Sequence, residues 1–171
     1  MRNLLFMPLI IGLALFSVSC DSNNNASSST ETQPQHSSAH QAPPEVEAKI
    51  LEDVTEDLRI IVATGSDTSQ LSTAMTGKAL EETKAQIGKD LAEGKVRKRD
   101  YQNIDVKLGD YTMPIAEVLA EFEDMGYYVD ASTGVALTEP SKEHKSYALA
   151  VVEESGRWKI RLILSPTATT T

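Results

Sequence analysis

The chain has 171 residues, of which 16 are basic and 25 are acidic, so its formal net charge is −9. This acidity argues against nucleic acid or an anionic lipid surface as the main partner, because both would repel the chain. A single cysteine excludes an intrachain disulfide.

Residues 1–19 combine a charged start with a short apolar run. Arg2 precedes an apolar stretch at 4–18, which is shorter than the roughly 20 residues of a membrane span and is typical of a cleaved signal peptide. The residues before Cys20 resemble the lipobox of bacterial lipoproteins, although Ser17 stands where that family usually has an aliphatic residue. The resemblance implies that Cys20 carries lipid such as palmitate and anchors the protein to the extracytoplasmic side of the cell membrane. The alternative is an ordinary secretory signal that leaves Cys20 as a free thiol.

Polar segments flank the expected domain on both sides. Residues 21–44 contain no large aliphatic or aromatic side chain, so 20–44 is predicted to be the lipid attachment site and a disordered tether. The Thr-rich end at 167–171 is predicted to be a disordered tail. A single folded domain is therefore expected at 45–166.

Helices are expected in the first half of this domain. A first helix is predicted to end at Thr64 and Gly65, because glycine suits the left-handed cap. Its apolar residues recur at spacings of three and four, as on one face of a helix: Val46, Ile50, Val54, Leu58 and Ile61. A short helix is predicted at 68–75, and a third at 78–92 that stops at Gly94.

The second half changes to the period of two that is typical of strands. Strands are predicted at 101–108 and 147–151, and a tight turn at 154–156 leads into another strand at 158–164. Residues 115–125 fit two patterns, because their apolar positions match a helix stripe and also alternate with glutamates as in a strand. Propensity favours the helix.

Two clusters of polar residues suggest binding sites but have simpler interpretations. Lys95, Arg97, Lys98 and Arg99 are predicted to form a solvated strand edge, since no aromatic interleaving supports nucleic-acid binding. His36 and His40 lie four residues apart in the tether, between prolines and without a carboxylate or cysteine partner, so no metal site is expected there.

Two short motifs resemble the nuclear-transport-factor-2-like (NTF2-like) superfamily, including its membrane-associated branches and the C-terminal domain of plastid division proteins. The motifs are Thr76-Gly77-x-x-Leu80-Glu81 at a helix start and the Gly-Arg-Trp-Lys-Ile ending at 156–160. The resemblance implies an α+β cone, with N-terminal helices packed on a curved, mainly antiparallel sheet. It also implies that 115–125 is a strand and that Trp158 is a core residue.

Some members of this superfamily are enzymes with a cavity carboxylate as base and a tyrosine or protonated acid as oxyanion donor. The residues that match these roles by type are Glu121, Glu123, Asp124, Tyr127, Tyr128, Asp130, His144 and Tyr147. Glu121 and Glu123 alternate as on a solvated strand face, Asp130 begins a loop-like run, and His144 lies in a polar run predicted to be an exposed turn. No catalytic residue, cofactor or metal is therefore predicted.

Three functions remain open at this stage. The leading hypothesis is a noncatalytic module on the envelope surface that binds another envelope protein or forms a homodimer. Its predicted interaction face is Ala148, Ala150, Val152 and Ile163, on the side of the sheet away from Leu149 and Ile160. The alternatives are a binder of a small apolar molecule and an isomerase-like or hydratase-like enzyme. An apolar cavity without a buried carboxylate would favour the apolar-ligand binder.

Overall fold

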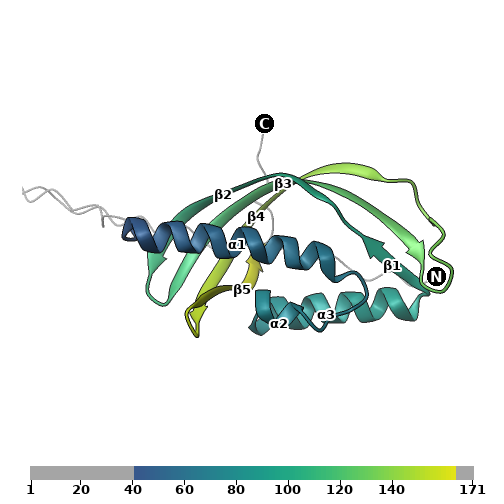
Figure 1. Ribbon diagram of the computed structural model, residues 1–171, viewed down its shortest axis with the longest axis horizontal. Helices are drawn as coiled ribbons and strands as arrows, with labels where there is room; N and C mark the ends of the chain where they lie inside the picture. Colours follow the sequence, from purple (N-terminus) through teal and green to yellow (C-terminus); the bar gives the residue numbers. More distant parts are fainter. Residues whose placement is uncertain (1–40, 165–171) are drawn as a thin grey trace, which may run out of the picture. The chain divides into compact units, whose positions relative to one another are not determined.

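The computed structural model describes residues 41–164, in which helices precede strands (Figure 1). The elements are α1 (Pro44–Thr64), α2 (Leu71–Ala74), α3 (Gly77–Ala92), β1 (Lys95–Lys98), β2 (Tyr101–Thr112), β3 (Ile115–Asp130), β4 (Ser141–Glu154) and β5 (Arg157–Leu164). This order confirms the predicted α+β class. The predicted signal peptide, Cys20, the tether up to residue 40 and the tail at 167–171 lie outside the described residues.

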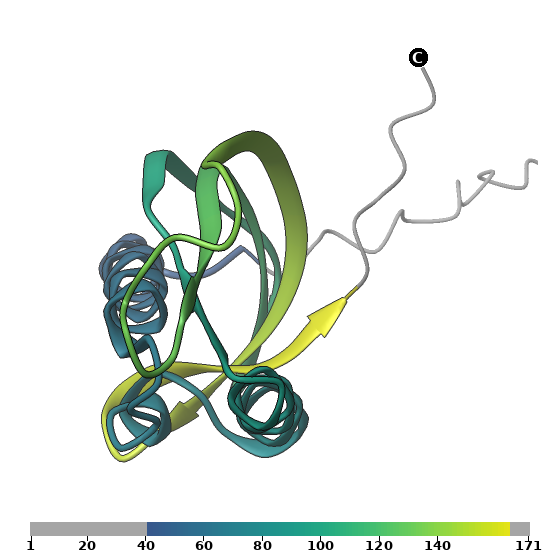
Figure 2. The same cartoon turned by 90° about the vertical axis from the view of Figure 1, so that its right-hand side faces the viewer.

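The sheet is five-stranded and is organised around β3. One edge of β3 pairs first with β2 and then with the short β1, while its other edge pairs with β4, which pairs in turn with β5. All of these strand pairs are antiparallel. Figure 2 shows that the sheet is curved and that the helices lie on its concave side. We call the other side of the sheet the outer face.

Residues 115–125, which fit both a helix pattern and a strand pattern, are part of strand β3. Its burial alternates as the strand pattern requires, with Val118, Ala120 and Phe122 buried. Pairing on both edges of β3 gives its backbone groups hydrogen-bond partners along most of its length, which overrides the helix propensity of its alanines and glutamates. The strand predicted from the NTF2-like resemblance is thus confirmed.

The core lies between the helices and the concave face. Four residues of the α1 stripe are buried as predicted and Val46 is partly buried against the core; α1 packs on β2 and β5, and α3 packs on β5 and β1. Trp158 is buried in this core, which confirms its predicted place. The start of α3 is fixed to β5, because the Thr76 N–H donates a 2.9 Å hydrogen bond to the Ile160 carbonyl. Gly77 follows with φ of +53°, a conformation that glycine adopts without strain.

One predicted feature of the sheet is wrong. Ile163 does not share a face with Ala148, Ala150 and Val152. Ile160 pairs with Val151, but Leu162 pairs with Ala150, so Arg161 is an extra residue that bulges from β5. A bulge shifts the alternation by one residue. Ile163 therefore pairs with Leu149 on the concave face, while Leu162 and Leu164 lie on the outer face with Ala150 and Ala148.

Candidate functional site

A cavity of about 370 Å³ lies between the helices and the concave face of the sheet. Its apolar lining comes from both helical and strand segments: Leu58, Ile61, Met75, Phe122, Leu149, Ile160 and Ile163. Ile163 is 37% exposed and so reaches the opening. The bulge in β5 thus places Ile163 in the cavity wall, a position that a strict alternation along the strand could not predict.

Three aromatic rings form part of the cavity wall. Tyr101 stacks on Phe122 with 4.2 Å between ring centroids, and Phe122 lies 5.8 Å from Tyr147. Burial raises the pKa of Tyr101, so its hydroxyl stays protonated at neutral pH and can donate a hydrogen bond. The wall therefore combines apolar ring surface with phenolic hydroxyl groups.

The cavity lining contains no buried carboxylate. Among its lining residues only Glu82 is acidic. Glu82 is exposed on α3 and forms a 3.4 Å ion pair with Lys78. A base inside an apolar cavity needs a carboxylate held away from water, and these lining residues do not supply one. The lining is suited to holding an apolar molecule and lacks the group that would abstract a proton from it.

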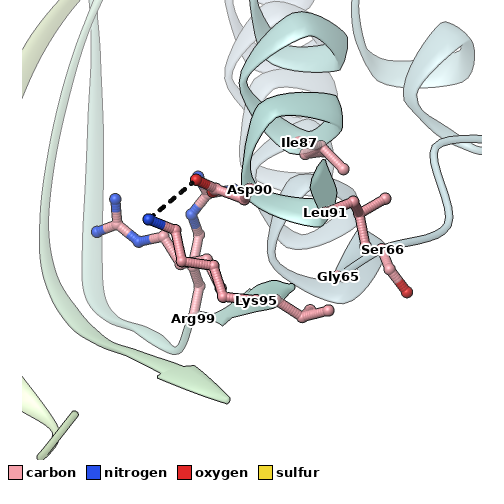
Figure 3. Close-up of a pocket in the computed structure, with 9 residues that line it drawn as sticks. Gly65, Ser66, Ile87, Asp90, Leu91, Lys95 and Arg99 are labelled. Carbon is pink, nitrogen blue, oxygen red and sulfur yellow. Dashed lines mark ion pairs between the residues drawn. The ribbon is translucent and has the colours of Figure 1, made fainter. Parts of the chain in front are cut away.

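Of the predicted basic cluster, Arg99 alone lines this cavity. As predicted, Lys95, Arg97 and Lys98 belong to an edge strand, β1, and Lys98 is exposed, but Lys95 and Arg97 have carboxylate partners. Lys95 forms ion pairs with Asp90 (3.8 Å) and Glu93 (2.6 Å). Figure 3 shows Lys95 and Arg99 beside the end of α3, around a hollow of about 10 Å³ that holds at most about one water molecule.

The remaining cations of the cluster differ in their partners. Arg97 donates a 2.8 Å hydrogen bond to Asp124, whose side chain is buried. Arg99 lies between β1 and β2, lines the 370 Å³ cavity and enters no ion pair with any residue of 41–164.

The structure does not bring the predicted acid and base candidates together in the cavity. Only Tyr147 among the eight lines the cavity. Glu123 binds Asn103 (2.7 Å) and Lys142 (2.8 Å). Glu121, two residues earlier on β3, lies on the same outer face of the sheet. Asp124 is buried in its ion pair with Arg97, so it holds β1 and β3 together.

The other candidates belong to the end of β3 and to β4. Tyr127 and Tyr128 pair with β1. Asp130 begins a turn, as predicted, and hydrogen bonds from Ser132 and Thr133 lower its pKa to about 2. The predicted turn at His144 is wrong, because this exposed residue lies in β4 opposite Glu123. Pairing with the long β3 extends β4 through a polar run that has no apolar alternation of its own.

A buried ionic cluster between α1 and β5 was not predicted. Asp57 is 0% exposed, and its Oδ1 accepts a 2.6 Å hydrogen bond from Arg157. Asp53 accepts a 3.0 Å hydrogen bond from the Trp158 backbone N–H and forms an ion pair with Lys49. Burial raises the pKa of Asp57 to about 7, against the opposing effect of Arg157.

This cluster is separate from the cavity, because neither Asp57 nor Arg157 belongs to the cavity lining. One sequence signal could have revealed it. Asp53 and Asp57 are four residues apart, directly before Val54 and Leu58 of the apolar stripe, so they lie beside the buried side of the helix.

The outer face has an exposed apolar hollow of its own. It lies where the β2–β3 turn meets β4 and the end of β5, with a volume of about 400 Å³. Met113, Ile115 and Leu164 are exposed there, and Ala150 of the predicted interaction face lines it. Val152 is buried, while Ala148 is half-buried.

No family model and no curated protein sequence matches the chain. Among solved structures, the intermembrane space region of the chloroplast protein ARC6 is similar at 16% identity and a TM-score of 0.55, covering 69% of this chain and 95% of its own. This likeness shows a shared α+β fold in which helices pack on a curved antiparallel sheet. A protein with a cystatin-like fold from Caulobacter vibrioides also matches, at 12% identity and a TM-score of 0.42, covering 71% of this chain and 92% of its own.

Two negative findings apply to residues 41–164. No helix there is both long and apolar enough to cross a membrane. No group of three or more histidine, cysteine or acidic residues in this range is arranged to hold a metal ion.

Proposed function

We propose that this protein is a lipid-anchored envelope protein whose cystatin-like domain binds a small apolar molecule without transforming it. The observation that carries the proposal is the apolar cavity of about 370 Å³ with no buried carboxylate in its lining. Its size falls within the range of ligand pockets, roughly 300 to 1,000 Å³. Its wall offers aliphatic and aromatic surface together with a few polar groups at the opening, the usual composition of a small-molecule site.

The geometry favours binding over catalysis. The one described carboxylate whose pKa is raised, Asp57, lies in the ion pair with Arg157 and outside the cavity lining. A ligand in the cavity would meet the hydroxyl groups of Tyr101 and Tyr147 without a base beside them. These phenols can orient a ligand by hydrogen bonding.

Narrowing the cavity should weaken binding of a neutral apolar probe, N-phenyl-1-naphthylamine. Tryptophan in place of Ile163 adds ring volume to the cavity wall, so we expect Ile163→Trp to weaken probe binding by about tenfold or more, since overfilling a packed site costs about 1–3 kcal/mol. The measurement is the rise in probe fluorescence on titration with the purified protein.

Leu164→Trp is the matched control for this substitution. Leu164 is 38% exposed, against 37% for Ile163, but it lies on the outer face. Its replacement should leave probe affinity unchanged. Equal loss of affinity in the two variants would show that the probe does not bind in the cavity.

The apolar hollow on the outer face supports a second candidate function, binding of an envelope protein or a second copy of the chain. Exposed Met113, Ile115 and Leu164 form an apolar patch that is suited to protein contact. Self-association through this patch would appear as a dimer in sedimentation analysis and would be weakened by Ile115→Glu.

The membrane anchor is proposed from the sequence of residues 1–20. We expect cells that express the wild type to incorporate labelled palmitate into the protein, and expect Cys20→Ala to incorporate none and to leave the membrane fraction. Removal of residues 1–19 takes away Arg2 and leaves 15 basic against 25 acidic residues, a net charge of −10, so charge alone would not hold the unlipidated protein on an anionic membrane. Equal labelling of both proteins would refute lipidation at Cys20.

A further inference from the structure

The charges around the cavity point to the chemistry of its ligand. This inference rests on the proposed binding function and concerns Arg99. Of the cations Lys95, Arg97 and Arg99, the first two have carboxylate partners, namely Asp90 and Glu93 for Lys95 and Asp124 for Arg97. Arg99 lines the cavity and has no such partner within 41–164.

The one acidic residue of the lining already has a cationic partner. Glu82 on α3 forms its ion pair with Lys78, 3.4 Å away. The lining therefore carries one positive charge that is free to meet a ligand, in a chain whose net charge is −9. A guanidinium group in this position favours an anionic oxygen, which it can hold with two parallel hydrogen bonds.

The rest of the lining suits a hydrocarbon chain. Apart from Arg99, Glu82, Thr83, Gln86 and the hydroxyls of its two tyrosines, the lining is aliphatic and aromatic. A volume of about 370 Å³ corresponds to about a dozen methylene-sized groups, taking roughly 30 Å³ for each as for a water molecule. This is room for one chain of medium length.

We propose that the cavity binds a single-chain amphiphile with an anionic head, such as a fatty acid, with the chain against Phe122, Leu149 and Ile163 and the head at Arg99. An anionic head bound by a partly exposed arginine gains about 1 kcal/mol over a hydroxyl head, because solvent screens the charge. This corresponds to a preference of about fivefold.

Decanoate and decanol test this proposal, since they share one alkyl chain length and differ in the charge of the head. Each is used at neutral pH to displace N-phenyl-1-naphthylamine from the purified protein. We expect decanoate to displace the probe about fivefold more effectively than decanol from the wild type. Arg99→Gln should remove this preference, measured within the variant as the ratio of displacement by decanoate to displacement by decanol.

Lys98→Gln is the matched control. It removes the same charge from the neighbouring residue, which is exposed and is not part of the cavity lining. The preference for decanoate should persist in this variant. Equal displacement by the two ligands in the wild type would overturn the proposal, as would a preference that survives Arg99→Gln or is lost equally in Lys98→Gln. In those cases the bound probe would still support an apolar site, whereas failure of the probe itself to bind would overturn the proposed function together with this inference.

Discussion

Replacing Arg157 with methionine should lower the free energy of unfolding by about 3 kcal/mol at pH 8, within the usual cost of breaking a buried ion pair. Arg157 donates the 2.6 Å hydrogen bond to Asp57, which has no contact with solvent. Without the guanidinium, the Asp57 carboxylate either stays charged in the core or takes up a proton, and both states cost free energy at pH 8. The Arg157 side chain is 33% exposed, so we place the cost at the lower end of the usual range.

Urea unfolding of the purified variants measures this effect. Arg59→Met is the control, because Arg59 lies on α1, the helix that carries Asp57, in an exposed ion pair with Glu56 at 3.5 Å. This pair should contribute less than about 1 kcal/mol to the free energy of unfolding. The double variant Asp57→Leu/Arg157→Met removes both charges and should recover most of the lost stability. An Arg157→Met variant as stable as Arg59→Met would show that the ion pair does not hold α1 to β5.

The stability of the domain should fall as the pH rises from 5 to 8. Burial raises the folded-state pKa of Asp57 from its ordinary value of 3.8 to about 7, so between these pH values the folded state holds a proton that the unfolded state has lost. The stability that protonated Asp57 contributes is fully present below the pKa of Asp57 in the unfolded state. It is lost as the pH rises through the pKa of Asp57 in the folded state. This shift corresponds to a decrease of about 2–3 kcal/mol in unfolding free energy over the window from pH 5 to 8.

The variant Asp57→Asn isolates this contribution, because its amide does not titrate. All other titratable groups are the same in the two proteins, so a difference in pH dependence of the unfolding free energy belongs to Asp57. The carboxylates whose pKa values are lowered, such as Asp130 and Glu123, lose their contribution only at more acidic pH. Unfolding free energies from urea titrations at pH 5 and 8 should therefore differ less in Asp57→Asn than in wild type. The same slope in both proteins would assign the pH dependence to another group.

Much of the fold could be predicted from the sequence because local pattern and tertiary structure agree. The α1 stripe and the turn before Trp158 carry signals of short range, and both form as expected. Residues 115–125 carried two patterns, and only the long-range pairing of β3 on both edges decides between them. The polar run around His144 has no apolar alternation that would indicate a strand. It is a strand because it pairs with β3.

The candidate site could not be predicted in the same way. The cavity is made by side chains from two helices, four strands and two linking residues, which are far apart in the sequence. Ile163 reaches the cavity only because Arg161 bulges from β5, and the sequence has no residue that marks this bulge. The basic cluster was visible, but the pairing of Arg97 depends on Asp124, which lies on another strand.

The most direct test of ligand binding in the cavity is the effect of N-phenyl-1-naphthylamine on the methyl NMR spectrum of the purified protein. Binding in the cavity predicts that the resonances of Leu149, Ile160 and Ile163 shift, while those of Ile115 and Leu164 on the outer face stay in place. Shifts confined to Ile115 and Leu164, or no shifts at all, would contradict a ligand site between the helices and the sheet.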